Sequence, residues 1–267
     1  MPSNIHLPAS KETRLQALKS PDAAKATVTE HWGQRDQPAV VEYVLNQFKG
    51  SKLVVLGHSV GGTAIKLHHL SLAHIMALLP ETLRSQIFRA VFISANNPNW
   101  QYVPPKFVPT FREIWTKTRN ASVKEGYLPR SASFFGVTLP AGPAIEWSSG
   151  MLSEDKRYLA GTPKLTSFYT SWEPKNEIIS IAFKDDITIM RQEEPVPIDA
   201  WCEIHTKAKI TRVLLSPDEY GGKEIGHVGM FKDGHEDVWE LIRNIIMDGK
   251  IPDKGKTRRW NQGKSRL

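Results

Sequence analysis

The sequence predicts an α/β protein in which helices flank a parallel sheet. Short, mainly apolar runs with the character of strands occur at residues 53–56, 88–94, 178–183 and 210–215, and the first is wholly apolar, as is typical of a strand that is buried on both faces. Helical patterns separate these runs, and such alternation is typical of parallel βαβ units. The 267 residues are 40% hydrophobic and 24% charged, which excludes a disordered, collagenous or coiled-coil chain. We therefore expect a single domain over residues 1–267.

The elements of the first half follow from periodicity and from the residues that interrupt it. A helix is expected over about 36–48, with Asp36 as its cap and a proline in its first turn. The run KLVVL at 52–56 lies between two glycines and predicts the first strand. A second helix is expected from about 62 to 76, and FRAVFIS at 88–94 predicts the next strand.

Residues 98–175 differ from the rest of the chain and predict an insertion rather than more sheet. They hold 13 of the 24 aromatic residues, mixed with many prolines. Strand character returns at 178–183 and 210–215, with a helix expected near 197–207 between them. A final amphipathic helix is expected over about 235–247.

Charge and cysteine content bear on the partners and the compartment. The net charge is +7, and residues 250–267 carry seven basic side chains against one acidic side chain. Such a tail can touch nucleic acid or acidic lipid, but it has no nucleic-acid-binding fold signature. We expect it to be disordered and to bind no specific nucleic acid. The single cysteine, Cys202, allows no intramolecular disulfide, and the sequence shows no apolar leader and no membrane span, which predicts a cytoplasmic protein.

One motif carries chemistry. Residues 53–62 read LVVLGHSVGG, in which a buried-strand pattern runs into G-x-S-x-G and then into a helical segment. In this context the serine stands on a sharp strand-to-helix turn, where glycines avoid collisions with the neighbouring strand and helix. The motif predicts that Ser59 is a nucleophile and that the backbone N–H of Val60 is an oxyanion donor. The alternative is that Ser59 only caps the helix that follows.

An activated serine needs a base and a carboxylate that orients the base, in the chain order Ser, Asp or Glu, His. After IISIAF come Asp185 and Asp186, and after ITRVLL comes a loop that carries His227. His227 is the expected base. Either aspartate fits the acid, and the pair also fits a solvated turn.

Several other histidines compete with His227 for the role of the base. They are His58, His68, His69, His74, His205 and His235. Those at 68, 69 and 74 fall within the expected helix, and those at 205 and 235 do not lie in a loop that follows a strand.

No metal or cofactor is expected. The glycine-rich run GGKEIGH at 221–227 lacks the ending of a phosphate-binding loop, and His235-Glu236 lacks the second histidine of a zinc-binding helix. Cys202 and His205 alone cannot close a metal site.

With Ser59, Asp186 and His227 in these places, the chain resembles the α/β-hydrolase superfamily. The resemblance is greater to a group of uncharacterised predicted hydrolases described as esterase- or lipase-like. HWGQRDQPAVVEYV looks like that group's helix before the nucleophile, GHSVGG like its nucleophile turn, GYLPRSASFFGVTLPAGPAIEW like its lid and EIGHVGMF like its histidine loop. The resemblance favours Asp186 over Asp185. It implies a serine hydrolase that uses no cofactor, forms an acyl-enzyme and acts on a small-molecule acyl substrate. The aromatic residues at 98–175 favour an apolar acyl group, and the alternative is that they only complete a core.

The resemblance has one departure, at the N-terminus. Four strands and an oxyanion loop normally precede the helix at 36–48, and only about 35 residues do so here. The four expected strands therefore correspond to the fifth to eighth of the superfamily, and the second oxyanion donor is missing. LVVL becomes the edge of the sheet, which predicts self-association through that edge. Two interpretations stay open: a truncated hydrolase, or a catalytically impaired relative that binds a small apolar ligand or a partner protein.

Overall fold

The structure is a computed structural model. It describes residues 16–17, 19–58, 79–97, 99–133, 136, 138–155, 170–173, 175, 177–186, 194–251, 253 and 255–260. The helix expected at 62–76 therefore lies outside the described residues, as do Ser59, Val60, His68, His69 and His74.

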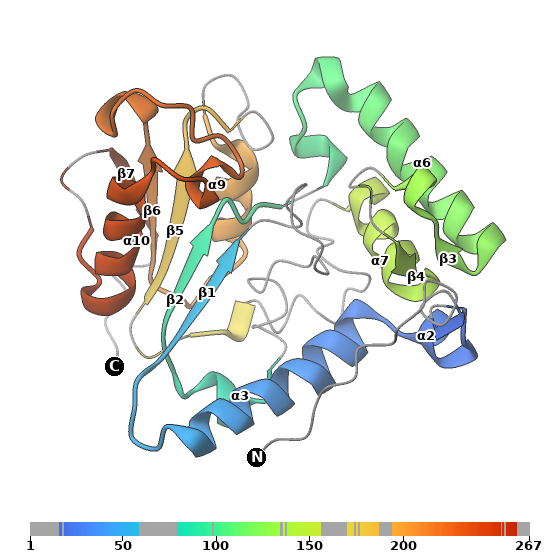
Figure 1. The fold of residues 1–267 in the computed structure, drawn as a ribbon, viewed down its shortest axis with the longest axis horizontal. Helices are drawn as coiled ribbons and strands as arrows, with labels where there is room; N and C mark the ends of the chain where they lie inside the picture. The colour runs from blue at the N-terminus through green and yellow to red at the C-terminus, as the bar shows by residue number, and fades with distance from the viewer. Residues whose placement is uncertain are drawn as a thin grey trace.

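A five-stranded sheet forms the centre of the described molecule, with the strand order β1-β2-β5-β6-β7 (Figure 1). The strands are β1 (Leu53–His58), β2 (Ile87–Ile93), β5 (Glu177–Phe183), β6 (Ile210–Leu215) and β7 (Lys256–Trp260). The first four run parallel, as the sequence predicts, and their bounds agree with the expected ones within two residues. The fold is thus a mostly parallel sheet with flanking helices.

Helices cover both faces of this sheet. One face packs against α3 (Gln37–Gln47), α5 (Glu81–Arg84) and α9 (Val196–Glu203), which contribute buried apolar side chains to a common core. The other face packs against α10 (Glu236–Asp248). Neighbouring residues alternate between the two cores along β2: Ala90 and Phe92 face one, and Val91 and Ile93 face the other.

The start of α3 differs from the expectation. Asp36 has helical backbone angles and closes a π-helical segment, Val28–Asp36, so α3 continues from an existing turn rather than beginning at a cap. Val41 is buried under the sheet, whereas Val40 and Tyr43 are exposed.

The disorder expected for residues 250–267 is wrong for 256–260, which form β7. This strand pairs antiparallel with β6, and Arg258 lies opposite Arg212. Both guanidinium groups donate hydrogen bonds to the largely buried carboxylate of Asp199 on α9, at 2.7 Å from Arg258 and 3.0 Å from Arg212. Trp260 packs against the core. The segment is ordered because a buried acid and an apolar surface, both distant in sequence, hold it.

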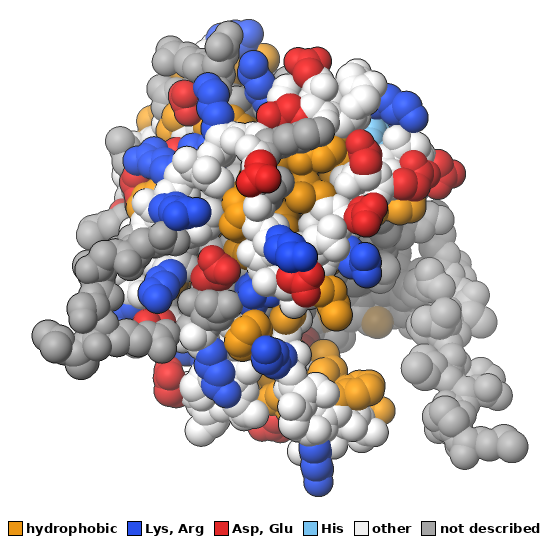
Figure 2. All heavy atoms as spheres, turned by 90° about the vertical axis from the view of Figure 1, so that its left-hand side faces the viewer, with side chains coloured by type: hydrophobic (Ala, Val, Ile, Leu, Met, Phe, Trp, Pro, Cys, Tyr) orange, Lys and Arg blue, Asp and Glu red, His pale blue; other side chains and the backbone are white. Residues whose placement is uncertain are grey.

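The face of the molecule that carries β7 and α10 is not uniformly basic. Figure 2 shows basic and acidic side chains interspersed over it, with apolar patches between them. At the opposite end of the described sheet lies β1, in which Leu56 is 42% exposed. Self-association through this edge stays a prediction.

Two helices of the insertion form a separate unit on the side of the molecule away from α10 (Figure 1). They are α6 (Val108–Glu125) and α7 (Ala141–Leu152), and the short antiparallel pair β3 (Tyr127–Leu128) and β4 (Leu139–Pro140) lies between them in sequence. The unit has a small core of its own, built around Trp115 and Trp147, whose ring centroids are 5.1 Å apart. The insertion thus contains a little sheet, contrary to expectation.

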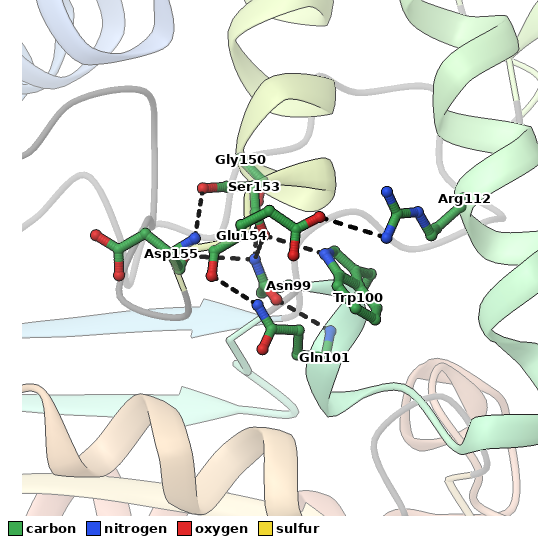
Figure 3. A network of polar contacts seen from close by, with 8 residues as sticks. All are labelled: Asn99, Trp100, Gln101, Arg112, Gly150, Ser153, Glu154 and Asp155. Carbon is green, nitrogen blue, oxygen red and sulfur yellow. Dashed lines mark hydrogen bonds and ion pairs between the residues drawn. The ribbon is translucent and has the colours of Figure 1, made fainter.

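Asn99 joins the two ends of this unit (Figure 3). Its fully buried side-chain amide donates to the backbone carbonyl of Ser153 at 2.8 Å and reaches that of Gly150 at 3.3 Å. Trp100 also donates to the Ser153 carbonyl, and Gln101 donates to that of Glu154. The segment that leaves the sheet after β2 is therefore bound to the segment that follows α7.

The other helical elements given for the described residues are short. They are α2 (Pro21–Lys25) and the 3-10 turns Trp100–Tyr102, Pro105–Phe107, Arg130–Ala132, Pro217–Glu219 and Gly229–Phe231. None of the helices in the described ranges combines the length and apolar character that a membrane crossing requires.

Candidate active site

The candidate site lies at the carboxyl ends of the parallel strands. β1 ends at His58, β5 leads directly into Asp185 and Asp186, and β6 leads into the loop that carries His227. Because parallel strands end at the same edge of a sheet, segments far apart in sequence meet there. The structure brings Asp186 and His227 together at this edge.

Asp186 and His227 are joined by a short hydrogen bond. Nδ1 of His227 lies 2.6 Å from Oδ2 of Asp186, whose side chain is fully buried, while the side chain of His227 is 15% exposed. A carboxylate only accepts hydrogen bonds, so Nδ1 carries the donated proton and Nε2 of the neutral ring can accept another. The pair therefore has the arrangement of a general base oriented by an acid.

Asp185 has a different partner from its neighbour. Its Oδ2 accepts hydrogen bonds from the backbone N–H groups of Ile225 and Gly226, at 2.8 and 2.9 Å. The two residues of the acid pair thus hold the same loop in different places: Asp185 binds its backbone and Asp186 binds the ring of His227. Of the two candidates for the acid, the one in contact with the histidine is Asp186.

The histidine loop is also held by apolar contacts. Ile225 and Met230, on either side of His227, are buried in the core between the sheet and α10. Within the loop, the N–H of Gly229 donates to the carbonyl of Ile225 at 2.6 Å. These contacts fix the backbone before and after His227.

His58 contacts the same loop from β1. Its Nε2 lies 2.7 Å from the backbone carbonyl oxygen of His227, and the centroids of the two rings are 5.1 Å apart. The ring of Phe231 meets the His58 ring edge to face at 4.9 Å. Burial lowers the pKa of His58 to about 4, so the ring is neutral at pH 7. The sequence presents His58 as one of several candidate bases. Its place directly before Ser59, at the end of the strand, is the feature that indicates a position beside the site.

The other competing histidines in the described structure lie in different surroundings. His205 is buried and packs against the rings of Trp172 and Trp201. His235 is buried directly before α10. Ser59 and Val60 lie outside the described residues, so their expected roles stay predictions. Among the described residues, no group of three or more His, Cys, Asp or Glu side chains is placed to hold a metal ion.

The chain is similar to several solved structures at low sequence identity. No protein-family model matches the chain, and no curated protein matches it significantly. An extracellular α/β-hydrolase from a Paenibacillus species is 15% identical, with a TM-score of 0.44, over 84% of this chain and 82% of that one.

Two further solved structures are similar. One, from carboxylesterases of the ammonia-oxidizing thaumarchaeon Nitrososphaera gargenis, is 12% identical, with a TM-score of 0.42, over 85% of this chain and 75% of that one. The other, a thioesterase domain from the curacin biosynthetic pathway, is 14% identical, with a TM-score of 0.38, over 81% and 75%.

Proposed function

We propose that the protein is a serine hydrolase of the α/β-hydrolase type that cleaves carboxylic esters or related acyl compounds. The observation that carries the proposal is the 2.6 Å contact between Asp186 and His227 at the carboxyl edge of the sheet. The same histidine is in contact with His58, and Ser59 is joined to His58 by a peptide bond. The sequence therefore supplies a serine directly after a side chain that contacts His227.

The proposed reaction has two halves. Nε2 of His227 takes the proton of the Ser59 hydroxyl as its oxygen attacks the acyl carbon, and Asp186 stabilises the imidazolium that forms. The N–H of Val60 donates to the developing oxyanion. The intermediate then expels the alcohol, which receives the proton from His227. Water hydrolyses the acyl-enzyme by the same steps, with no cofactor.

Three aromatic residues of the insertion pack inside its own core and do not indicate the kind of substrate. Phe111, Trp115 and Trp147 pack against one another in the core of the α6–α7 unit. Their side chains therefore stabilise the unit itself, and an apolar acyl group cannot be argued from them.

Labelling with a fluorophosphonate probe tests the proposal. Wild-type protein is expected to form a covalent adduct, and Ser59→Ala is expected to form none while keeping the same circular dichroism spectrum. Hydrolysis of a short-chain p-nitrophenyl ester should be lost in parallel. A folded wild type that does not label, or a mutant that labels equally, would overturn the proposal and favour a non-catalytic relative that binds a ligand or a partner.

A further inference from the structure

The imidazole ring of His58 lies against the histidine loop and contacts two of its residues. Three contacts are made: a 2.7 Å hydrogen bond to the backbone carbonyl of His227, a ring contact with His227 and an edge-to-face contact with Phe231. The partners are separated from His58 by more than 160 residues of sequence. One side chain thus links the end of β1 to the loop after β6.

The direction of the hydrogen bond follows from its acceptor. A backbone carbonyl oxygen only accepts, so Nε2 of His58 carries the proton. Because burial lowers the pKa of this ring to about 4, the ring stays in that neutral form at pH 7. His58 is therefore a constant donor rather than a proton carrier.

Three side chains, Asp185, Asp186 and His58, form hydrogen bonds with the histidine loop at or beside His227. Asp185 accepts from the N–H groups of Ile225 and Gly226, Asp186 holds Nδ1 of the ring, and His58 holds the carbonyl oxygen. The first two contacts come from the end of β5. The contact with His58 comes from the strand that leads into Ser59, so it alone among these ties the loop to the segment of the expected nucleophile.

We propose that His58 is a positioning residue that fixes the distance between the base His227 and the strand end that carries Ser59. The inference rests on the proposed function, in which His227 takes the proton of Ser59. Proton transfer needs the two groups within about 2.6–3.2 Å, and a displacement of about 1 Å can cost on the order of 10²-fold in rate. A hydrogen bond of fixed direction between the two segments limits that displacement.

Three variants separate the hydrogen bond from the packing. His58→Leu removes the donor and keeps an apolar side chain. His58→Gln keeps an N–H donor that can reach the same carbonyl. Phe231→Leu removes the ring contact and leaves the hydrogen bond intact; Phe231 is 48% exposed, so this control is expected to fold. If His58→Leu does not fold, His58→Phe replaces it, because Phe keeps a ring without the donor.

Kinetics give the first readout. In His58→Leu, kcat for a p-nitrophenyl ester is expected to fall by on the order of 10²-fold with KM unchanged, because substrate binding does not involve the contact. His58→Gln is expected to recover most of kcat, and Phe231→Leu to stay near the wild type. A fall in Phe231→Leu equal to that in His58→Leu, or no recovery in His58→Gln, would assign the effect to packing and overturn the inference.

Hydrogen exchange gives a second readout that does not depend on hydrolysis. The N–H groups of Gly229, Phe231 and Lys232 form hydrogen bonds within the loop and are expected to exchange faster in His58→Leu but not in His58→Gln. Unchanged exchange in His58→Leu overturns the inference, whatever the activity. Faster exchange in a protein that hydrolyses nothing supports the link between strand and loop, and the proposed function is then what fails.

Discussion

Asp185 and Asp186 are adjacent in sequence yet bind different parts of one loop, so their substitution should have different effects. Asp186→Asn keeps the volume but presents an amide to Nδ1 of His227, which favours the wrong tautomer. We expect kcat/KM for a p-nitrophenyl ester to fall by roughly 10³- to 10⁴-fold. In Asp185→Asn the amide oxygen can still accept from Ile225 and Gly226, and a fall of about tenfold is expected. A larger loss in Asp185→Asn than in Asp186→Asn would contradict the assignment.

His58 should make stability depend on pH. Its pKa is lowered from 6.5 to about 4 mainly by burial, against the opposing effects of the hydrogen bond to His227 and the charge of Asp186. As the pH falls, His58 takes up a proton in the unfolded chain at a higher pH than in the folded chain. Its contribution to the free energy of unfolding is therefore fully present above pH 6.5 and is lost toward pH 4, by up to about 3 kcal/mol.

The glutamine variant tests this dependence. Urea unfolding gives the free energy of unfolding of the wild type and of His58→Gln at several pH values between 7 and 4. As the pH falls, the variant is expected to lose less of this free energy than the wild type. Both proteins share every other titrating group, so these cancel in the comparison. Curves that stay parallel through the whole range would show that His58 is not the responsible group.

At the scale of the elements, Arg89 and Gly249 together close the C-terminus of α10. The buried guanidinium of Arg89, on β2, donates to the carbonyl oxygens of Ile245 and Ile246 at 3.3 and 3.0 Å. Gly249 follows the helix at a φ of +69°, and a Cβ there would collide with the guanidinium. Gly126 ends α6 at a φ of +72°, but no described atom lies within 4 Å of its Cβ position.

The two glycines therefore form a matched pair. Gly126→Ala should cost about 1 kcal/mol, from the left-handed backbone alone. Gly249→Ala carries the same backbone cost and must also displace Arg89, so we expect it to lose about 1–3 kcal/mol more. Urea unfolding measured by circular dichroism gives both values. Equal losses of unfolding free energy in the two variants would mean that the Arg89 side chain moves aside without destabilising the protein.

The sequence predicts best the elements whose structure follows from the pattern of their own residues. The strands at 178–183 and 210–215 are mainly apolar runs, and both form where expected. β7 reads as a charged tail, because what holds it is Asp199 on α9, more than fifty residues away. The site shows the same division. Chain order points to His227 and to either Asp185 or Asp186, and the resemblance favours Asp186. The contacts of Asp185 and His58 with the histidine loop connect segments far apart in sequence, and no local pattern encodes them.

At the scale of the whole molecule, the sheet and the α6–α7 unit are joined through Asn99. Its buried amide donates to the carbonyl groups that end α7, and in Asn99→Ala each of these carbonyls keeps only its second donor, Trp100 for Ser153 and the N–H of Ser153 for Gly150. A typical hydrogen bond contributes about 0.5–1.5 kcal/mol to stability, and the variant loses those of Asn99 to Ser153 and Gly150 together with the one that its side-chain oxygen accepts from the N–H of Gln101, so we expect Asn99→Ala to be destabilised by about 1–3 kcal/mol. Because the residue holds the entry and exit of the insertion together, amide exchange should also rise in α6 and α7 more than in β2 and β5.

Gln101 offers the matched control. It donates to the carbonyl of Glu154, on the same returning segment, but that hydrogen bond is exposed to solvent and water can replace it. Gln101→Ala is therefore expected to change the free energy of unfolding by less than about 0.5 kcal/mol and to leave exchange in α6 and α7 unaltered. If the two variants behaved alike, or if Asn99→Ala raised exchange evenly over the sheet and the insertion, Asn99 would be an ordinary core residue. The difference in the free energy of unfolding between Asn99→Ala and Gln101→Ala therefore gives the contribution of the buried Asn99 amide to holding the insertion against the sheet.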